Sequence, residues 1–165
     1  MTPIRLFLLA AALLAGASAA EAQERRPVLN HVSVMTILNT CAAWAEERDL
    51  SLSIAVVDDA TQLRGFVTMD GALFATRDIA RRKAYTAAAA NQPTSEAGWL
   101  AQLPGVAEGG AYVPLRGGVP LRTGDGSLIG AVGVSGAPAE VDEQCAIAAV
   151  EAAGLEHGVE DSEAD

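Results

Sequence analysis

The stretch DGALFATRDIARRKAYTAAAA, residues 70–90, decides how we interpret the rest of the chain. Its Asp-Gly pair predicts a turn, and the residues after it predict a helix that begins at Thr76, the expected N-cap. The alanines would let this helix pack closely on a sheet, because no bulky side chain holds the two backbones apart. Asp78 precedes Arg82 by four residues, which favours an ion pair on one face of the helix.

The same helix carries a basic run, Arg81-Arg82-Lys83. In one interpretation this run is only the solvated edge of a packing helix. In the other, the basic run, the Asp-Gly turn and a later glycine-rich loop enclose a small-molecule site. The sequence does not identify the ligand.

The composition fits one domain with an aliphatic core. The chain has 165 residues, of which 50% are apolar but only 4% aromatic. Its formal net charge of -10 argues against nucleic acid as a partner, because phosphates would be repelled. A local basic edge can still bind a small anion.

Residues 1–22 have the pattern of a signal peptide. Arg5 provides the positive start, residues 6–14 the apolar run, and Ala20-Glu21-Ala22 the cleavage motif. The apolar run is short for a bilayer span, so we expect no stable membrane anchor. We expect a mature protein that is periplasmic or secreted from a bacterium after cleavage near Ala22.

Export bears on the two cysteines, Cys41 and Cys145. An even number of cysteines in an oxidising compartment favours a disulfide. Two buried free thiols are the alternative. With no C-x-x-C motif and no obvious activating base nearby, we expect no catalytic role for either cysteine.

Hydrophobic periodicity predicts a single α/β (α+β) domain, followed by an acidic, disordered tail over residues 156–165. The expected architecture is an α/β/α sandwich of the profilin-like or PAS-like kind, with a five-stranded, mostly antiparallel sheet. The expected helices are 31–48, 76–90, 94–103 and 139–153, and the expected strands include 51–57, 63–69, 111–115 and 127–135.

Several motifs, in order along the chain, resemble the GlcG/HbpS-like family of haem-binding or haem-degrading-like domains. The matching pieces are SIAVVD at 53–58, MDGA at 69–72, DIARRKAYTAA at 78–88, the Gln-Pro-Thr break at 92–94, RGGVPL at 116–121 and IGAVGVSGAPAEVDE at 129–143. The resemblance implies a profilin-like domain over residues 23–155. It also implies assembly into homo-oligomers, and haem or corrinoid binding by some members.

Carried over residue by residue, the resemblance marks a set of ligand-binding candidates. Glycine-rich backbone can approach a ligand closely, and Lys83 could hold a haem propionate as a point charge. Iron usually needs a His, Cys, Met or Tyr ligand, so His31 is the candidate axial ligand, with Tyr85 and Tyr112 as substitutes. The candidates are Asp70, Asp78, Lys83, Tyr85, Gly117, Gly118, Pro120, Ser135, Gly136 and Asp142.

Three functions remain open at this point. The first is an exported module that binds or senses haem or a related tetrapyrrole. The second is an enzyme, or an enzyme accessory, that acts on small oxygenated acids, although we find no Ser-His-Asp set, metal cluster or phosphate loop. The third is an oligomeric accessory protein without a ligand.

Overall fold

A computed structural model describes residues 26–104 and 110–159 of the chain. The expected signal peptide and residues 160–165 of the expected tail lie outside these ranges. In chain order the elements are α2 (His31–Glu46), β1 (Ser53–Asp58), β2 (Leu63–Thr68), α3 (Thr76–Ala90), the 3-10 helix η1 (Ala97–Gln102), β3 (Gly118–Arg122), β4 (Leu128–Ser135) and α5 (Ala139–Ala152).

The strands form one antiparallel sheet in the order β2-β1-β4-β3. Strand β1 lies in the centre between β2 and β4, and its Ser53 pairs with Thr68 on one side and Ser135 on the other. This central place explains why β1 is almost continuously apolar, since both of its faces are covered. The α+β fold class predicted from the sequence is therefore confirmed.

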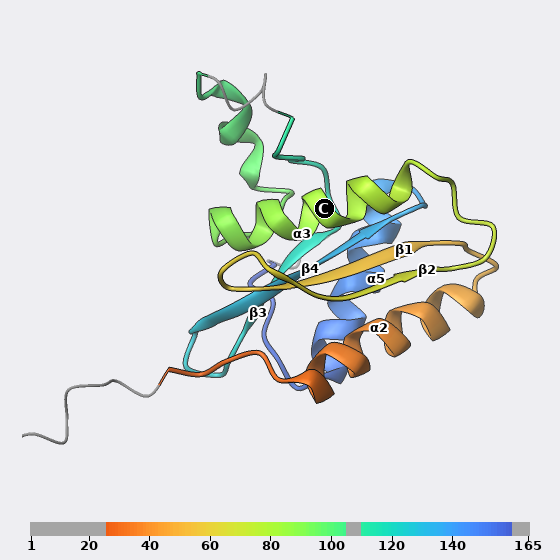
Figure 1. The fold of residues 1–165 in the computed structure, drawn as a ribbon, viewed down its shortest axis with the longest axis horizontal. Helices are drawn as coiled ribbons and strands as arrows, with labels where there is room; N and C mark the ends of the chain where they lie inside the picture. Colours follow the sequence, from red (N-terminus) through yellow and green to blue (C-terminus); the bar gives the residue numbers. More distant parts are fainter. Residues whose placement is uncertain (1–25, 105–109, 160–165) are drawn as a thin grey trace, which may run out of the picture.

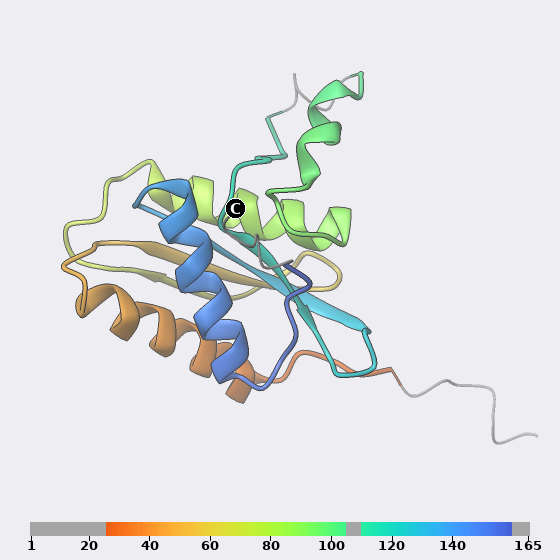
Figure 2. The same ribbon diagram turned by 180° about the vertical axis from the view of Figure 1, so that it is seen from behind.

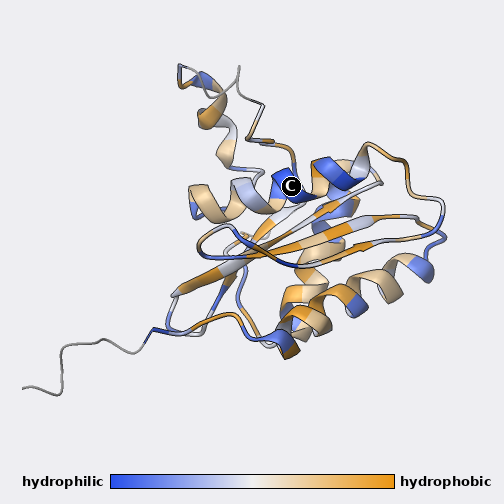
Figure 3. Cartoon of the chain, in the orientation of Figure 1, coloured by the Kyte–Doolittle hydropathy of each residue, from blue (hydrophilic) through white to orange (hydrophobic). Residues whose placement is uncertain are grey.

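Helices cover both faces of the sheet (Figures 1 and 2). Helices α2 and α5 pack on one face, where alternate strand residues such as Ile54 and Val134 enter the larger core. Helix α3 packs on the other face, over Ala55, Val57 and Ala131. Figure 3 shows hydrophobic colours along the central strands and a blue, charged segment within α3.

The expected close approach of the alanine-rich helix to the sheet is present. A Cβ atom added to Gly133 of β4 would lie 2.1 Å from the carbonyl oxygen of Ala80 and 2.4 Å from the amide nitrogen of Ala84. These distances leave no room for a side chain. The pairing of a bare glycine with small helical residues thus fixes the depth at which α3 lies on the sheet.

Among the residues that the structure describes, the sheet has four strands, so the prediction of five was wrong. The expected strand at 111–115 is irregular, because side chains rather than a neighbouring strand bind its backbone. The amide of Val113 donates to Oγ1 of Thr86 at 2.8 Å, and the carbonyl of Leu115 accepts from Oγ1 of Thr94 at 2.6 Å. The strand in this part of the chain is β3, which begins at Gly118.

Thr76 is the first residue of α3 and not its N-cap, which is Ala75. The Thr76 hydroxyl donates to the carbonyl of Leu73 at 2.7 Å and lies 2.9 Å from Oγ of Ser53. It therefore ties the start of α3 to β1. The short expected helix at 94–103 is the 3-10 helix η1.

The two cysteines form a disulfide between α2 and α5, across 104 positions of sequence.

The folded domain extends beyond residue 155, where we expected it to end. Glu156 and Arg122 exchange two backbone hydrogen bonds of 2.9 and 3.0 Å. Within the described ranges, none of the helices combines the length and apolar character that crossing a membrane requires.

Candidate functional site

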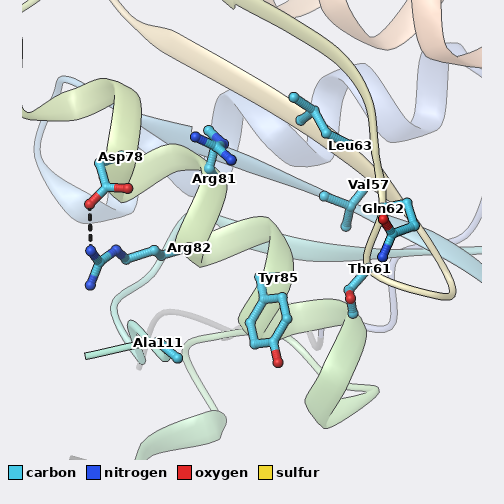
Figure 4. Close-up of a pocket in the computed structure, with 9 residues that line it drawn as sticks. All are labelled: Val57, Thr61, Gln62, Leu63, Asp78, Arg81, Arg82, Tyr85 and Ala111. Atoms are coloured by element: carbon cyan, nitrogen blue, oxygen red, sulfur yellow. Dashed lines mark ion pairs between the residues drawn. The ribbon is translucent and has the colours of Figure 1, made fainter. Parts of the chain in front are cut away.

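A groove of about 390 Å³ runs between α3 and the turn that joins β1 to β2 (Figure 4). The helix contributes charged and polar side chains to it, and the hairpin contributes the apolar Val57 and Leu63 together with the polar Thr61 and Gln62. Its lining residues are Val57, Thr61, Gln62, Leu63, Asp78, Arg81, Arg82, Tyr85 and Ala111. The volume lies at the lower end of the range, roughly 300–1,000 Å³, in which small-molecule sites fall.

Two of the helical side chains are engaged with each other. Nη2 of Arg82 lies 2.7 Å from Oδ2 of Asp78, which confirms the expected ion pair (Figure 4). Arg82 also donates from Nη1 to the carbonyl of Gly110. The Arg82 guanidinium therefore holds the chain near Ala111 against α3 and forms a fixed wall of the groove.

Arg81 differs from Arg82, because it has no hydrogen-bond or ion-pair partner within the described parts of the chain. It is exposed, and its guanidinium lies in the groove beside Leu63 (Figure 4). A guanidinium offers five N–H donors in a planar fork that matches a carboxylate. The groove thus combines an uncommitted cation with an apolar wall.

Tyr85 lies one helical turn after Arg81 on the same face of α3, and its ring faces the groove near Thr61 (Figure 4). The rings of Tyr85 and Tyr112 have centroids 5.4 Å apart. A hydrogen bond to Tyr85, and to a lesser degree burial, raise the pKa of Tyr112 above its ordinary value of 10.0. Tyr112 is therefore a protonated phenol at neutral pH.

A second group of expected site residues lies inside the protein. Nζ of Lys83 lies 2.8 Å from Oδ2 of Asp142 and donates to the carbonyl of Val134 at 2.8 Å. Both charged side chains are only 3% exposed. A Cβ atom on Gly117 would lie 2.9 Å from Nζ of Lys83, so the glycine makes space for the ammonium.

The structure therefore brings Lys83 beside Gly117 and Gly118, as the sequence predicted, but in a buried ion pair. The expectation that Lys83 belongs to a solvated basic edge was wrong. Successive residues of an α-helix are about 100° apart around its axis, so a run of three cannot share one face. Arg81 faces outward, whereas Lys83 faces the interior.

The pKa of Asp142 is raised above 3.8, because burial penalises its charged form more than the Lys83 ammonium and the Ala137 amide favour it. Glu143, the next residue, is also buried and binds Nη1 of Arg116 through Oε2 at 2.9 Å. Two ion pairs thus lie side by side where α5 begins.

The remaining candidates lie apart from the groove. Asp70 is exposed in the turn after β2, and its carbonyl accepts a hydrogen bond from Ser51. Ser135 is the last residue of β4 and Gly136 follows it, and Pro120 of β3 pairs with Ala131 of β4. His31 is exposed at the start of α2, in the layer on the other side of the sheet from α3.

Sequence reasoning did not single out Arg81, whose guanidinium lies in the groove, or Leu63, whose side chain lines it. Helical spacing could have revealed the first, since residues 78, 81, 82 and 85 share one face at steps of three and four. No local signal could have revealed Leu63, which reaches the groove only through the pairing of β2 with β1.

The fold and the groove define a small antiparallel α+β domain with a cationic, partly apolar groove along one helix. The chain belongs to the family described as haem degrading protein HbpS-like, whose model matches residues 29–151. The predicted family is therefore confirmed.

Solved structures agree with this assignment. The crystal structure of a PduOC–haem complex is 26% identical, covers 81% of this chain and 100% of its own, and superposes with a TM-score of 0.75. The crystal structure of HbpS is 32% identical, with coverage of 82% and 96% and a TM-score of 0.71. A double mutant of HbpS from Streptomyces reticuli is 33% identical, with coverage of 82% and 93% and the same TM-score of 0.71. No curated protein matches the chain.

Proposed function

We propose that this protein is exported and binds haem, or a related tetrapyrrole, in the groove beside α3. The observation that carries the proposal is the guanidinium of Arg81, which no residue of 26–104 or 110–159 binds, next to the apolar side chain of Leu63. A tetrapyrrole with carboxylate side chains combines an anionic edge with a flat apolar body. Membership of the HbpS-like family and the haem complex of PduOC support the same ligand class.

The chemistry of the groove fits the two ends of such a ligand. Arg81 can receive a propionate through a charge-assisted, bidentate hydrogen bond. Val57 and Leu63 supply apolar surface for the ring. Lys83, which the sequence suggested for the propionate, is already engaged with Asp142 and Val134, so Arg81 takes this role in the proposal.

Tyr85 is the side chain in the groove that could bind iron, because a phenolate is an established haem ligand. Tyr112 lies beside it, with the two ring centroids 5.4 Å apart. His31 does not line the groove, and α2 and α3 lie on opposite faces of the sheet (Figure 1). His31 could reach the same haem only from another copy of the chain.

Titration of haemin into the purified mature protein, followed through the Soret band, tests the proposal. We expect a saturable shift in the wild type. Arg81→Ala should weaken binding by about tenfold or more, because a hydrogen bond to a charged group contributes about 1.5–3 kcal/mol. Arg77→Ala removes the same charge from an exposed site on α3 outside the groove, and should leave the affinity unchanged.

The axial ligand is tested with the same titration. Tyr85→Phe should change the ferric spectrum, whereas His31→Ala should leave it unchanged. The opposite result would assign the iron to His31. A featureless titration of the wild type would overturn the haem proposal as a whole. Fractionation of the source cells tests export, and we expect a mature chain that begins near Gln23.

A further inference from the structure

Within the described parts of the chain, three residues other than glycine have a left-handed backbone, with φ of 54° at Asp49, 62° at Thr61 and 55° at Asn91. Aspartate and asparagine enter this region readily, because their short polar side chains can bond the local backbone. Threonine does not, since its branched Cβ comes too close to the following carbonyl. Thr61 is therefore the strained residue of the three.

The turn between β1 and β2 holds Thr61 in this conformation. The amide of Thr61 donates to the carbonyl of Asp58 at 2.9 Å, and the amide of Asp58 donates to the carbonyl of Gln62 at 2.9 Å. Oδ1 of Asp58 also accepts from the amides of Ala60 and Gln62, at 3.1 and 2.9 Å. A left-handed residue at the end of a hairpin turn is usually glycine. The hydrogen bonds of the turn therefore impose a backbone that threonine disfavours.

The strained residue lines the groove beside α3, whereas Asp49 and Asn91 do not. Figure 4 shows Thr61 on the hairpin side of the groove and Tyr85 on the helix side. The Thr61 hydroxyl donates to the carbonyl of Ala60 at 2.6 Å, which fixes the rotamer of the side chain. Glycine would relieve the strain, but it would leave this part of the groove without a side chain. Strain of this kind is concentrated at ligand sites.

We propose that Thr61 is a specificity-determining residue of the groove, where its rigid side chain packs on a flat tetrapyrrole such as haem. A β-branched side chain has few rotamers, so it provides a fixed contact with little loss of entropy on binding. It also narrows the groove between the hairpin and α3. A flat ring therefore fits better than a corrin, which carries groups on both faces. The inference rests on the proposed function, because it names the tetrapyrrole that the same groove favours.

Thr61→Gly tests the strain and the ligand contact in one variant. We expect its melting temperature to be about 2–4 °C above that of the wild type, because glycine adopts a left-handed backbone without strain. Its haemin affinity, measured through the Soret band, should fall by about tenfold, because the groove loses a packed side chain. Asp49→Gly is the matched control at an exposed left-handed position outside the groove, and should change neither quantity.

Thr61→Val separates the shape of the side chain from its hydroxyl group. This variant keeps the branched Cβ, so it should bind haemin as the wild type does, without the gain in melting temperature. Dicyanocobinamide, a corrin with a cyanide on each face, is the second ligand and is measured by equilibrium dialysis. The ratio of haemin affinity to cobinamide affinity should fall by about tenfold in Thr61→Gly and stay at the wild-type value in Thr61→Val.

Each outcome bears on one claim. A Thr61→Gly protein that melts at or below the wild-type temperature would overturn the inference, because no strain would be present. Wild-type haemin affinity in Thr61→Gly, with an unchanged affinity ratio, would overturn it as well, while leaving the proposed function intact. A featureless haemin titration of the wild type would overturn the proposed function and this inference together. Circular dichroism confirms that each variant is folded.

Discussion

The Nζ atom of Lys83 lies 2.8 Å from Oδ2 of Asp142, and this ion pair joins helices on opposite faces of the sheet. Lys83 belongs to α3 and Asp142 to the first turn of α5. Their contact passes the end of β4, where the carbonyl of Val134 accepts a second hydrogen bond from the ammonium. The pair therefore connects all three layers of the domain.

Lys83→Met should destabilise the protein by about 3–5 kcal/mol, the cost of leaving a buried charge without its partner. Oδ2 of Asp142 and the carbonyl of Val134 would both lose the donor that Lys83 supplies. Chemical denaturation of the purified variant measures the loss. Arg81→Met, two positions earlier on the exposed face, should change the unfolding free energy by less than about 0.5 kcal/mol. Equal losses in both variants would contradict a structural role specific to Lys83.

The raised pKa of Asp142 predicts a pH dependence of stability. Because the folded pKa lies above the unfolded value near 3.8, the native state binds a proton at a higher pH than the unfolded chain does. As pH falls through the folded pKa towards that value, the wild type should gain stability relative to Asp142→Asn, which cannot titrate. As pH rises through the same window, this gain is lost.

Denaturation curves of the two proteins across the acidic range test this sign. The difference between their unfolding free energies should become more favourable to the wild type as pH decreases. A difference that stays constant with pH would mean that the pKa of Asp142 is not shifted on folding. The comparison of wild type with Asp125→Asn should show the opposite sign of pH dependence. Hydrogen bonds from Thr123 and Ser127 lower the pKa of that exposed carboxyl, whereas burial raises the pKa of Asp142.

The sequence could predict much of the fold, because its elements carry strong local patterns. Helices α2, α3 and α5 and the hairpin of β1 and β2 lie close to their expected positions. The extra strand was expected at 111–115, after the glycine pair 109–110. Its backbone partners are hydroxyls of Thr86 and Thr94, which are distant in sequence, so no local pattern could exclude it.

The candidate site was harder to predict for a similar reason. The residues marked by family resemblance separate into a buried cluster around Lys83, a groove containing Asp78 and Tyr85, and the outer turn at Asp70. Sequence motifs mark candidate ligand-binding residues, but they do not indicate which cavity each side chain faces. That separation depends on helix phase and strand pairing, which only a three-dimensional structure resolves.

Gly133→Ala should destabilise the protein by about 1–3 kcal/mol, because the new methyl group would enter the backbone of α3. The nearest atom, the carbonyl oxygen of Ala80, lies 2.1 Å from the added Cβ and is not a flexible side chain. Thermal unfolding measures the effect. Gly98→Ala is the control, since a Cβ there meets no atom within 4 Å. If Gly133→Ala left the thermal stability unchanged, α3 would be able to move away from the sheet without loss of stability.

The disulfide between Cys41 and Cys145 should contribute about 4–5 kcal/mol, because it closes a loop of 104 positions in the unfolded chain. The double variant Cys41→Ala, Cys145→Ala should therefore unfold at a lower denaturant concentration than the oxidised wild type. Reductant should lower the stability of the wild type towards that of the double variant, and should leave the double variant unchanged. Alkylation in denaturant without reductant, followed by mass measurement, should modify neither cysteine. Modification of both would show that the thiols are free, and the expected stability difference would then be reduced to the packing of two small buried side chains.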